Sequence, residues 1–136
     1  MRKLNWSIGL ALCSIYSENV AVAEVSCNTA TLTGSYIISA LGTNDGSAAA
    51  YVGMISYDGR GSYRIRIHFA GPSQTTTQDT GTYIHLGGCE FEATANSGRS
   101  AHYFVAPTGD WFKYVMKSGG NMLGDAQRIS SDLLVE

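Results

Sequence analysis

Carboxylates and phenols in the C-terminal half of the sequence could transfer protons, so acid–base chemistry is the first possibility to consider. The set consists of Glu92, Asp125, Tyr83, Tyr103 and Tyr114, which share one face in the strand register described below. Burial near aromatic rings raises the pKa of a carboxyl group toward neutrality, where the group can donate and withdraw protons. Such a site suits isomerisation or cyclisation of a substrate without a cofactor.

His102 with Lys113 is a competing pair for the same chemistry. The catalytic candidates are therefore Glu92, Asp125, Tyr103 and His102. Ordinary cross-strand pairing of the same side chains is the alternative to catalysis.

Residue patterns for other reaction classes are missing. His68, His85 and His102 lie on different expected strands without H-x-H or H-E-x-x-H spacing, so we expect no zinc or iron site. The segment DGRG (58–61) opens no helix that would bind phosphate, and no serine stands in a G-x-S-x-G motif. We expect neither a metal nor a cofactor.

Residues 1–23 have the pattern of a signal peptide. Arg2 and Lys3 precede an apolar run, 4–16, that is too short to span a bilayer, and Ala21-Val22-Ala23 is a small-x-small cleavage pattern. A buried N-terminal helix is the alternative. We expect a single domain over 24–136, in the periplasm or secreted, with no membrane span.

Cys27 and Cys89 are the cysteines that remain after this cleavage. Disulfides form in the oxidising compartments that exported proteins enter, so we expect these two to pair. Two free thiols or half of a metal site are the alternatives, and neither has supporting ligands nearby.

The composition argues against a nucleic-acid partner. Charged residues are 15% of the chain, against about a quarter in typical domains. Arg60, Arg64 and Arg66 form the basic cluster, and they have acidic neighbours instead of a broad positive stripe. The high glycine content suits many short strands and tight turns.

Two-residue alternation recurs after residue 27, with turn residues about every ten positions. The expected strands are 34–41, 48–57, 61–70, 75–79, 81–86, 89–95, 100–106, 110–117 and 121–129. Short separating segments make consecutive strands antiparallel neighbours. We predict an all-β fold, an antiparallel up-and-down meander of eight or nine strands closing into a small barrel, because closure removes exposed edges. A two-sheet sandwich would need longer crossovers.

The stretch YDGRGSYRIRIHF (57–69) alternates apolar residues with Arg64 and Arg66. With Asp58-Gly59 as a two-residue turn, the facing pairs are Met54 with Tyr63, Val52 with Ile65 and Ala50 with Ile67. We expect this apolar row to face inward, because the opposite orientation would bury two unpaired arginines.

The same counting of residues across the turns predicts that the faces of the later strands combine apolar and charged or polar side chains. One face combines Ile84, Phe91 and Phe104 with Lys113, beside a second row that contains His102. Either His102 and Lys113 mark a polar end of a ligand cavity, or a bulge turns the tyrosine and carboxylate row inward. In a third interpretation, Lys113 lies at the barrel rim, His102 is a satisfied core histidine, and Tyr103, Phe112 and Tyr114 form a homodimer surface.

The segments CNTATLTGSY (27–36), AAYVGMISYDGRGSY (49–63) and TGTYIHLGGCE (80–90) resemble a group of small exported bacterial proteins. At the level of the fold, this group resembles the allene oxide cyclase-like barrels. The resemblance, over about residues 27 to 128, implies a barrel with a largely apolar lumen. It implies no catalytic residues, because no segment matches the catalytic motifs of the enzymes.

We therefore expect an exported barrel that binds a small apolar molecule in its lumen. The expected binding residues are Val52, Met54, Ile65, Ile67, Ile84, Phe91, Phe104 and Lys113. A cofactor-independent isomerase or cyclase in the same cavity is the alternative. A third possibility is a packed interaction module that uses its outer aromatic face.

Overall fold

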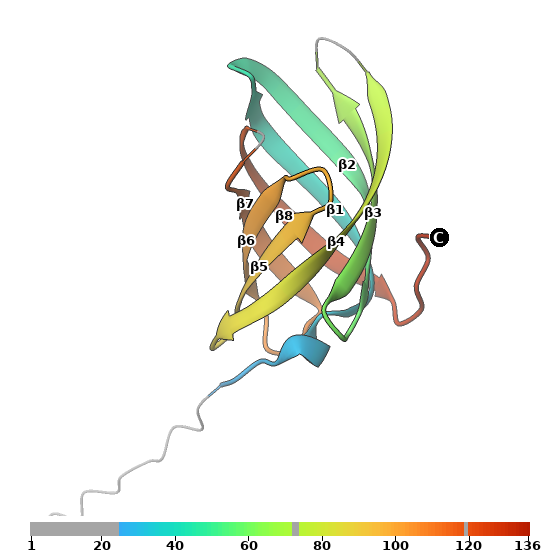
Figure 1. The fold of residues 1–136 in the computed structure, drawn as a ribbon, viewed down its shortest axis with the longest axis vertical. Coiled ribbons are helices and arrows are strands. Elements are labelled where there is room, and N and C mark those ends of the chain that lie inside the picture. Colours follow the sequence, from blue (N-terminus) through green and yellow to red (C-terminus); the bar gives the residue numbers. More distant parts are fainter. Residues whose placement is uncertain (1–24, 72–73, 119) are drawn as a thin grey trace, which may run out of the picture.

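Eight antiparallel strands form a closed barrel in chain order (Figure 1). The computed structural model describes residues 25–71, 74–118 and 120–136, so the expected signal peptide lies outside the described residues. The strands are β1 (Thr33–Asn44), β2 (Ser47–Asp58), β3 (Ser62–Ala70), β4 (Thr75–Gly87), β5 (Glu90–Ala95), β6 (Ser100–Val105), β7 (Trp111–Met116) and β8 (Asn121–Ser130). Pairing of β1 with β8 closes the barrel. The predicted all-β barrel is confirmed.

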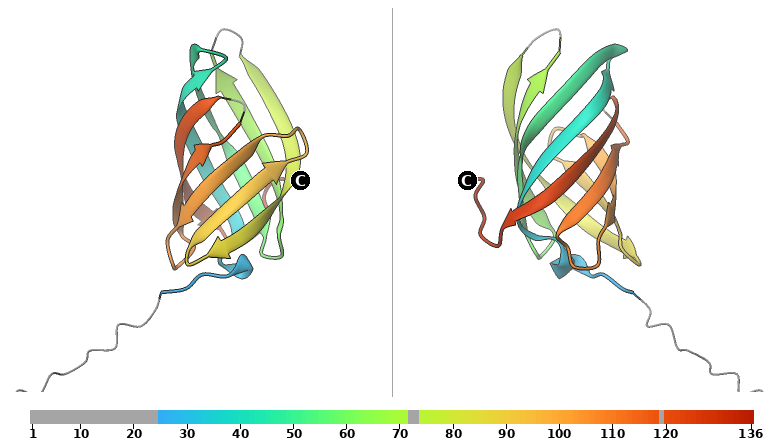
Figure 2. Two further views of the ribbon diagram at one scale, coloured as in Figure 1. Left: turned by 60° about the vertical axis from the view of Figure 1, so that its left-hand side comes forward. Right: turned by 180° about the vertical axis from the view of Figure 1, so that it is seen from behind.

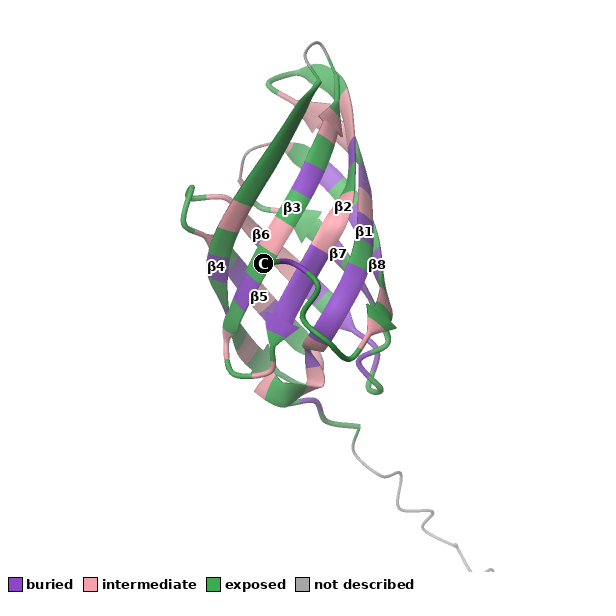
Figure 3. Ribbon diagram, turned by 90° about the vertical axis from the view of Figure 1, so that its right-hand side faces the viewer, coloured by how far each residue is buried: buried purple, intermediate pink, exposed green. Residues whose placement is uncertain are grey.

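Strand β3 has the expected orientation. Tyr63 and Ile67 are buried inside the barrel, whereas Arg64 and Arg66 are exposed (Figure 3). The alternation follows from the two-residue period of a strand, which sends successive side chains to opposite faces.

The partner row on β2 differs from the prediction because the β2–β3 turn is wider than two residues. The Asp58 carboxylate accepts hydrogen bonds from the backbone N–H groups of Arg60 (2.7 Å) and Ser62 (3.0 Å). Tyr57 therefore pairs with Tyr63, three positions from the register expected. Since an odd shift reverses the faces of a strand, the predicted inward orientation of Val52 and Met54 is wrong.

The later turns change the register by one residue. At the β5–β6 turn, Gly98 has a φ of 92° and the Ala95 N–H donates to the Arg99 carbonyl (2.8 Å), which is the geometry of a three-residue hairpin loop. Phe91 consequently pairs with Tyr103. A register shift between His85 and Gly87 has the same effect at the β4–β5 turn.

The barrel wall is not equally high on all sides. Strands β1, β2 and β4 have 12 or 13 residues, whereas β5, β6 and β7 have 6 each. Figures 1 and 2 show the β1–β2 and β3–β4 hairpins rising above β5, β6 and β7. The backbone of residues 75–79 in β4 pairs with β3 alone, so the barrel opens above the short strands.

The segment after β8 turns back over the outer face of β1, β2 and β3 (Figure 3). The N–H of Leu134 donates to the Ser35 hydroxyl (2.8 Å), and the N–H of Val135 donates to the Ser56 hydroxyl (3.0 Å). The two serine hydroxyls are hydrogen-bonded to each other at 2.7 Å and are buried beneath this tail.

Candidate functional site

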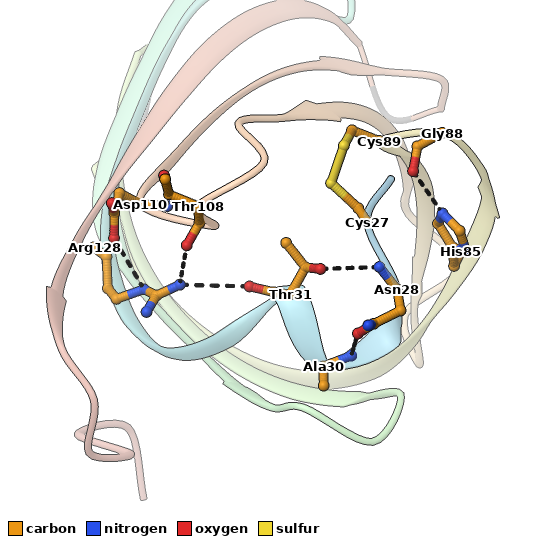
Figure 4. The surroundings of a disulfide bond; sticks show 10 residues. All are labelled: Cys27, Asn28, Ala30, Thr31, His85, Gly88, Cys89, Thr108, Asp110 and Arg128. Carbon is orange, nitrogen blue, oxygen red and sulfur yellow. Dashed lines mark hydrogen bonds and ion pairs between the residues drawn. A yellow bond between two sulfur atoms is a disulfide. The ribbon is translucent and has the colours of Figure 1, made fainter. Parts of the chain in front are cut away.

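The N-terminal segment closes one end of the barrel (Figures 1 and 4). It contains a short 3-10 helix, η1 (Thr29–Thr31), capped by Asn28, and its Leu32 side chain is fully buried. Cys27 is joined by a disulfide to Cys89, in the turn between β4 and β5, which confirms the predicted pair.

Polar side chains from the barrel fasten this segment to the wall. The Tyr83 hydroxyl contacts the Leu32 carbonyl at 2.9 Å, and the Arg128 guanidinium donates to the carbonyls of Thr31 (3.4 Å) and Thr108 (3.3 Å; Figure 4). This end of the lumen is therefore sealed by covalent and hydrogen-bonded contacts.

Aromatic rings fill the lumen above the sealed end, with Tyr57 at their centre. The ring of Tyr57 lies 5.6 Å from that of Tyr36, 5.2 Å from Tyr83 and 6.0 Å from Phe112, all in edge-to-face arrangements. Such pairs add to the stabilisation that comes from burial. This buried cluster forms a floor inside the barrel.

A cavity of about 470 Å³ lies between this floor and the open end. Its wall includes Ile38, Ile55, Ile65, Ile67, Met116 and Met122, one or two from each of several strands. The rings of Tyr51, Tyr103 and Tyr114 also line it. The space is thus bounded by aliphatic and aromatic surface, with a few phenolic hydroxyls.

Two of these phenols form a hydrogen-bonded pair in the wall. The Tyr51 hydroxyl donates to that of Tyr114 (2.7 Å), which in turn donates to the Ser39 carbonyl (3.3 Å). Burial raises the pKa of Tyr51 to about 12 and also raises that of Tyr114. Both side chains therefore stay protonated and uncharged at neutral pH. Because both phenolic protons are already donated, the Tyr51 oxygen is left with the capacity to accept a hydrogen bond.

The mouth of the cavity is polar. The Arg99 guanidinium lies 5.1 Å from the centroid of the Phe69 ring, in a cation–π arrangement. The Asp79 carboxylate accepts hydrogen bonds from the backbone N–H groups of Thr80 (2.8 Å) and Ser97 (3.3 Å). Burial acts to raise the pKa of Asp79, but its hydrogen bonds to Ser97 and Thr80, with the charge of Arg99, lower it on balance. The mouth thus carries one charge of each sign.

The expected binding residues separate into two groups. Ile65 and Ile67 line the cavity, and Phe91 is buried within the barrel. Val52, Met54, Ile84, Phe104 and Lys113 lie on the outer face, because the wider turns reverse the faces expected for their strands. Their expected place in the lumen wall is wrong.

The catalytic candidates do not come together. Glu92 accepts a hydrogen bond from Lys117 (2.7 Å) on the outer surface, Asp125 lies 3.6 Å from Lys113, and His102 pairs with Glu90 (3.1 Å). The Lys117 ammonium holds the pKa of Glu92 below its usual value, opposite to the raised pKa expected. Tyr103, in contrast, points into the lumen.

The aromatic face expected on the outside is inside. Tyr103, Phe112 and Tyr114 are 1–5% exposed, and the rings of Tyr103 and Phe112 stack at 4.9 Å within the barrel. The predicted homodimer surface through these residues is wrong. The interpretation with a bulge predicted that the tyrosines and the carboxylates both face inward. The tyrosines do face inward, whereas Glu92 and Asp125 face outward.

The sequence prediction also missed several cavity residues. Tyr51, Ile55 and Tyr57 are the residues of β2 that line the cavity, and Met116 and Arg99 line it as well. A signal for β2 is present in the sequence: Tyr51, Ile55 and Tyr57 alternate with smaller or polar residues and so form an inward row of their own.

Residues 25–71, 74–118 and 120–136, which the structure describes, contain neither a metal-binding cluster nor a membrane-spanning helix. His, Cys, Asp and Glu side chains form no group there that could hold a metal ion. Within those residues no helix has the length and apolar character needed to cross a membrane.

No protein-family model and no curated protein matches the chain. Among solved structures, the chain is similar to a de novo designed fluorescence-activating β-barrel, with a TM-score of 0.53 and 16% sequence identity. The match covers 76% of this chain and 99% of the designed one. At this identity the likeness shows the shared barrel fold.

Proposed function

We propose that the protein binds a small, largely apolar molecule in the cavity of its barrel. The observation that carries this proposal is the cavity of about 470 Å³, which has a closed aromatic floor and one open end. Ligand sites usually have volumes of roughly 300–1,000 Å³ and apolar walls with a few polar groups.

Burial of the ligand would supply most of the affinity. At roughly 25 cal/mol per Å², a ligand that buries about 200 Å² of apolar surface gains roughly 5 kcal/mol before the entropic cost of binding. The hydroxyls of Tyr51 and Tyr114 and the charged mouth would orient the molecule.

Binding has more support than an isomerase or cyclase activity. Glu92, Asp125 and His102, the expected acid–base groups, are engaged with lysine or glutamate partners on the outer surface. The ionisable side chains that do line the cavity are tyrosines, with Asp79 and Arg99 at its mouth.

We also propose that the chain is exported and related to the allene oxide cyclase-like barrels. The Cys27–Cys89 disulfide supports an oxidising compartment, and the barrel supports the kinship at the level of fold alone.

Ligand-dependent thermal unfolding with two neighbouring substitutions tests the binding proposal. Met116→Trp places a large ring in the cavity, whereas Val115→Trp places the same ring on the outer face, where Val115 is 44% exposed. A panel of apolar compounds should raise the melting temperature of the wild type and of Val115→Trp, because binding to the native state stabilises it.

Met116→Trp should retain its fold and lose this rise. Absence of any rise in the wild type, or an equal rise in both variants, would contradict binding in the cavity.

A further inference from the structure

Arg99 reaches across the open end of the barrel. It comes from the turn between β5 and β6, at the upper end of these short strands (Figure 1). Its guanidinium lies 5.1 Å from the centroid of the Phe69 ring, on β3, and both side chains line the cavity. Strand β4 lies between β3 and β5 in the barrel, so Arg99 crosses from the low part of the wall to the high part. The guanidinium is therefore held at the mouth, on the side of the lumen.

This guanidinium keeps its donors for a ligand. Within residues 25–71, 74–118 and 120–136, it forms a cation–π contact with Phe69 but no ion pair and no hydrogen bond. Arg128, at the sealed end, differs: it donates to the carbonyls of Thr31 and Thr108 and lies 3.9 Å from the Asp110 carboxylate. A guanidinium presents five N–H donors in a planar fork that matches a carboxylate.

Asp79, the anion among the described residues of the cavity lining, has other partners. Its carboxylate accepts hydrogen bonds from the backbone N–H groups of Thr80 and Ser97. Its distance from Arg99 is too long for an ion pair, although the charge of Arg99 helps to lower its pKa. A ligand with one negative charge can therefore pair with Arg99, whereas Asp79 would repel a ligand with two.

The inner end of the cavity is unsuitable for an anionic group. Burial raises the pKa of Tyr57 and of Tyr103, whose rings belong to the aromatic floor. A phenol that is difficult to ionise marks a region that stabilises negative charge poorly. An anionic group on a bound molecule would therefore lie at the mouth.

We propose that the bound molecule is an amphipathic carboxylate, whose apolar body fills the cavity while its carboxylate faces the open end and pairs with the Arg99 guanidinium. The inference rests on the proposed function, and it adds the chemical class of the ligand, its direction in the cavity and the residue that selects it.

Biphenyl-4-carboxylate, biphenyl-4-methanol and biphenyl-4-methylamine are suitable probes, because they share an apolar body and carry a negative, a neutral and a positive head at neutral pH. Calorimetric titration of the wild type should show about tenfold tighter binding of the carboxylate than of the alcohol. The amine should bind more weakly than the alcohol. Biphenyl-4-yl phosphate, a dianion, should bind more weakly than the carboxylate.

Arg99→Met separates the charge from packing, because methionine can still cover Phe69. This variant should bind the carboxylate and the alcohol equally and keep the affinity of the wild type for the alcohol. Arg66→Met is the matched control, since it removes the same charge from the exposed outer face of β3 and should keep the tenfold preference. Arg99→Glu should reverse the preference, so that the amine binds more tightly than the carboxylate.

The dependence on salt tests the ion pair in the wild type without any substitution. Added sodium chloride should weaken binding of the carboxylate and leave binding of the alcohol unchanged. A preference for the carboxylate that is independent of salt, or that persists in Arg99→Met, would overturn the pairing with Arg99.

Equal affinity of the wild type for the carboxylate and the alcohol, with clear binding, would overturn this inference and leave the proposed function standing. Binding of none of the biphenyl probes would overturn the inference, and failure of the apolar panel as well would overturn the proposed function.

Discussion

The ring of Tyr63 occupies the space that a side chain at Gly81 would need. A Cβ atom added at Gly81 would lie 2.5 Å from the Tyr63 hydroxyl oxygen and 2.4 Å from the Thr94 carbonyl oxygen. Gly81 lies within a continuous strand, β4, although the sequence suggested a break between 75–79 and 81–86. A glycine in a strand interior commonly marks such a close approach.

Gly81→Ala should destabilise the barrel by roughly 1–3 kcal/mol, because the added carbon displaces both the ring and the backbone of β5. Urea unfolding measures the change. Gly71→Ala is the control, since its Cβ would meet ordinary contacts at 3.8 Å, and it should leave stability nearly unchanged. Equal stability of the two variants would contradict the crowding at Gly81.

Loss of the Cys27–Cys89 disulfide should lower the free energy of unfolding by about 4 kcal/mol, less any strain, since the bond closes a long loop and holds the N-terminal segment over the barrel end. Chemical denaturation of the wild type with and without reductant measures this effect. The double variant Cys27→Ser, Cys89→Ser should not respond to reductant. A wild type equally stable in both conditions would show that the bond contributes nothing.

Stability should fall when the pH rises above about 10. Burial raises the pKa of Tyr51 and of Tyr83 to about 12, whereas tyrosines in the unfolded chain titrate near 10. Because the native state holds these protons more tightly, their contribution is fully present below pH 10 and is lost as the pH rises from about 10 to about 12. The slope is at most about 1.4 kcal/mol per pH unit for each tyrosine.

Denaturant unfolding at increasing pH, followed together with tyrosinate absorbance, tests this dependence. Ionisation of all tyrosines near pH 10 while the barrel is still folded would contradict the raised pKa values.

Ser56→Ala should destabilise the protein by roughly 1–2 kcal/mol, because it leaves the Val135 N–H without its acceptor and removes a partner of Ser35. The C-terminal tail should become more sensitive to carboxypeptidase, which mass spectrometry can follow. Ser62→Ala, at an exposed position of β3, is the control and should change neither property. An unchanged tail in Ser56→Ala would show that this hydrogen bond does not hold it.

Alternation and turn composition were sufficient to predict the barrel, its strand order and the orientation of β3. These features depend on local patterns and on the cost of burying Arg64 and Arg66, which a single sequence displays. The disulfide was predictable as well, because Cys27 and Cys89 are the cysteines of the described chain.

The lining of the lumen was harder to predict, because it depends on whether each turn shifts the register by an odd number of residues. Asp58 widens one turn through its two backbone hydrogen bonds, and Gly98 adds a residue to another through its positive φ. Each odd shift reverses which side chains of a strand face the lumen. Val52 and Phe104 therefore face outward, and their neighbours Tyr51 and Tyr103 face inward. The Asp-Gly and Ser-Gly pairs alone do not distinguish these turns from two-residue ones.

Native mass spectrometry of the protein purified from the cells that produce it is the most direct test of the binding proposal. We expect a defined excess mass that is released by organic solvent and identified as a largely apolar molecule. A mass equal to that of the protein alone, together with no thermal shift across the panel of apolar compounds, would contradict it.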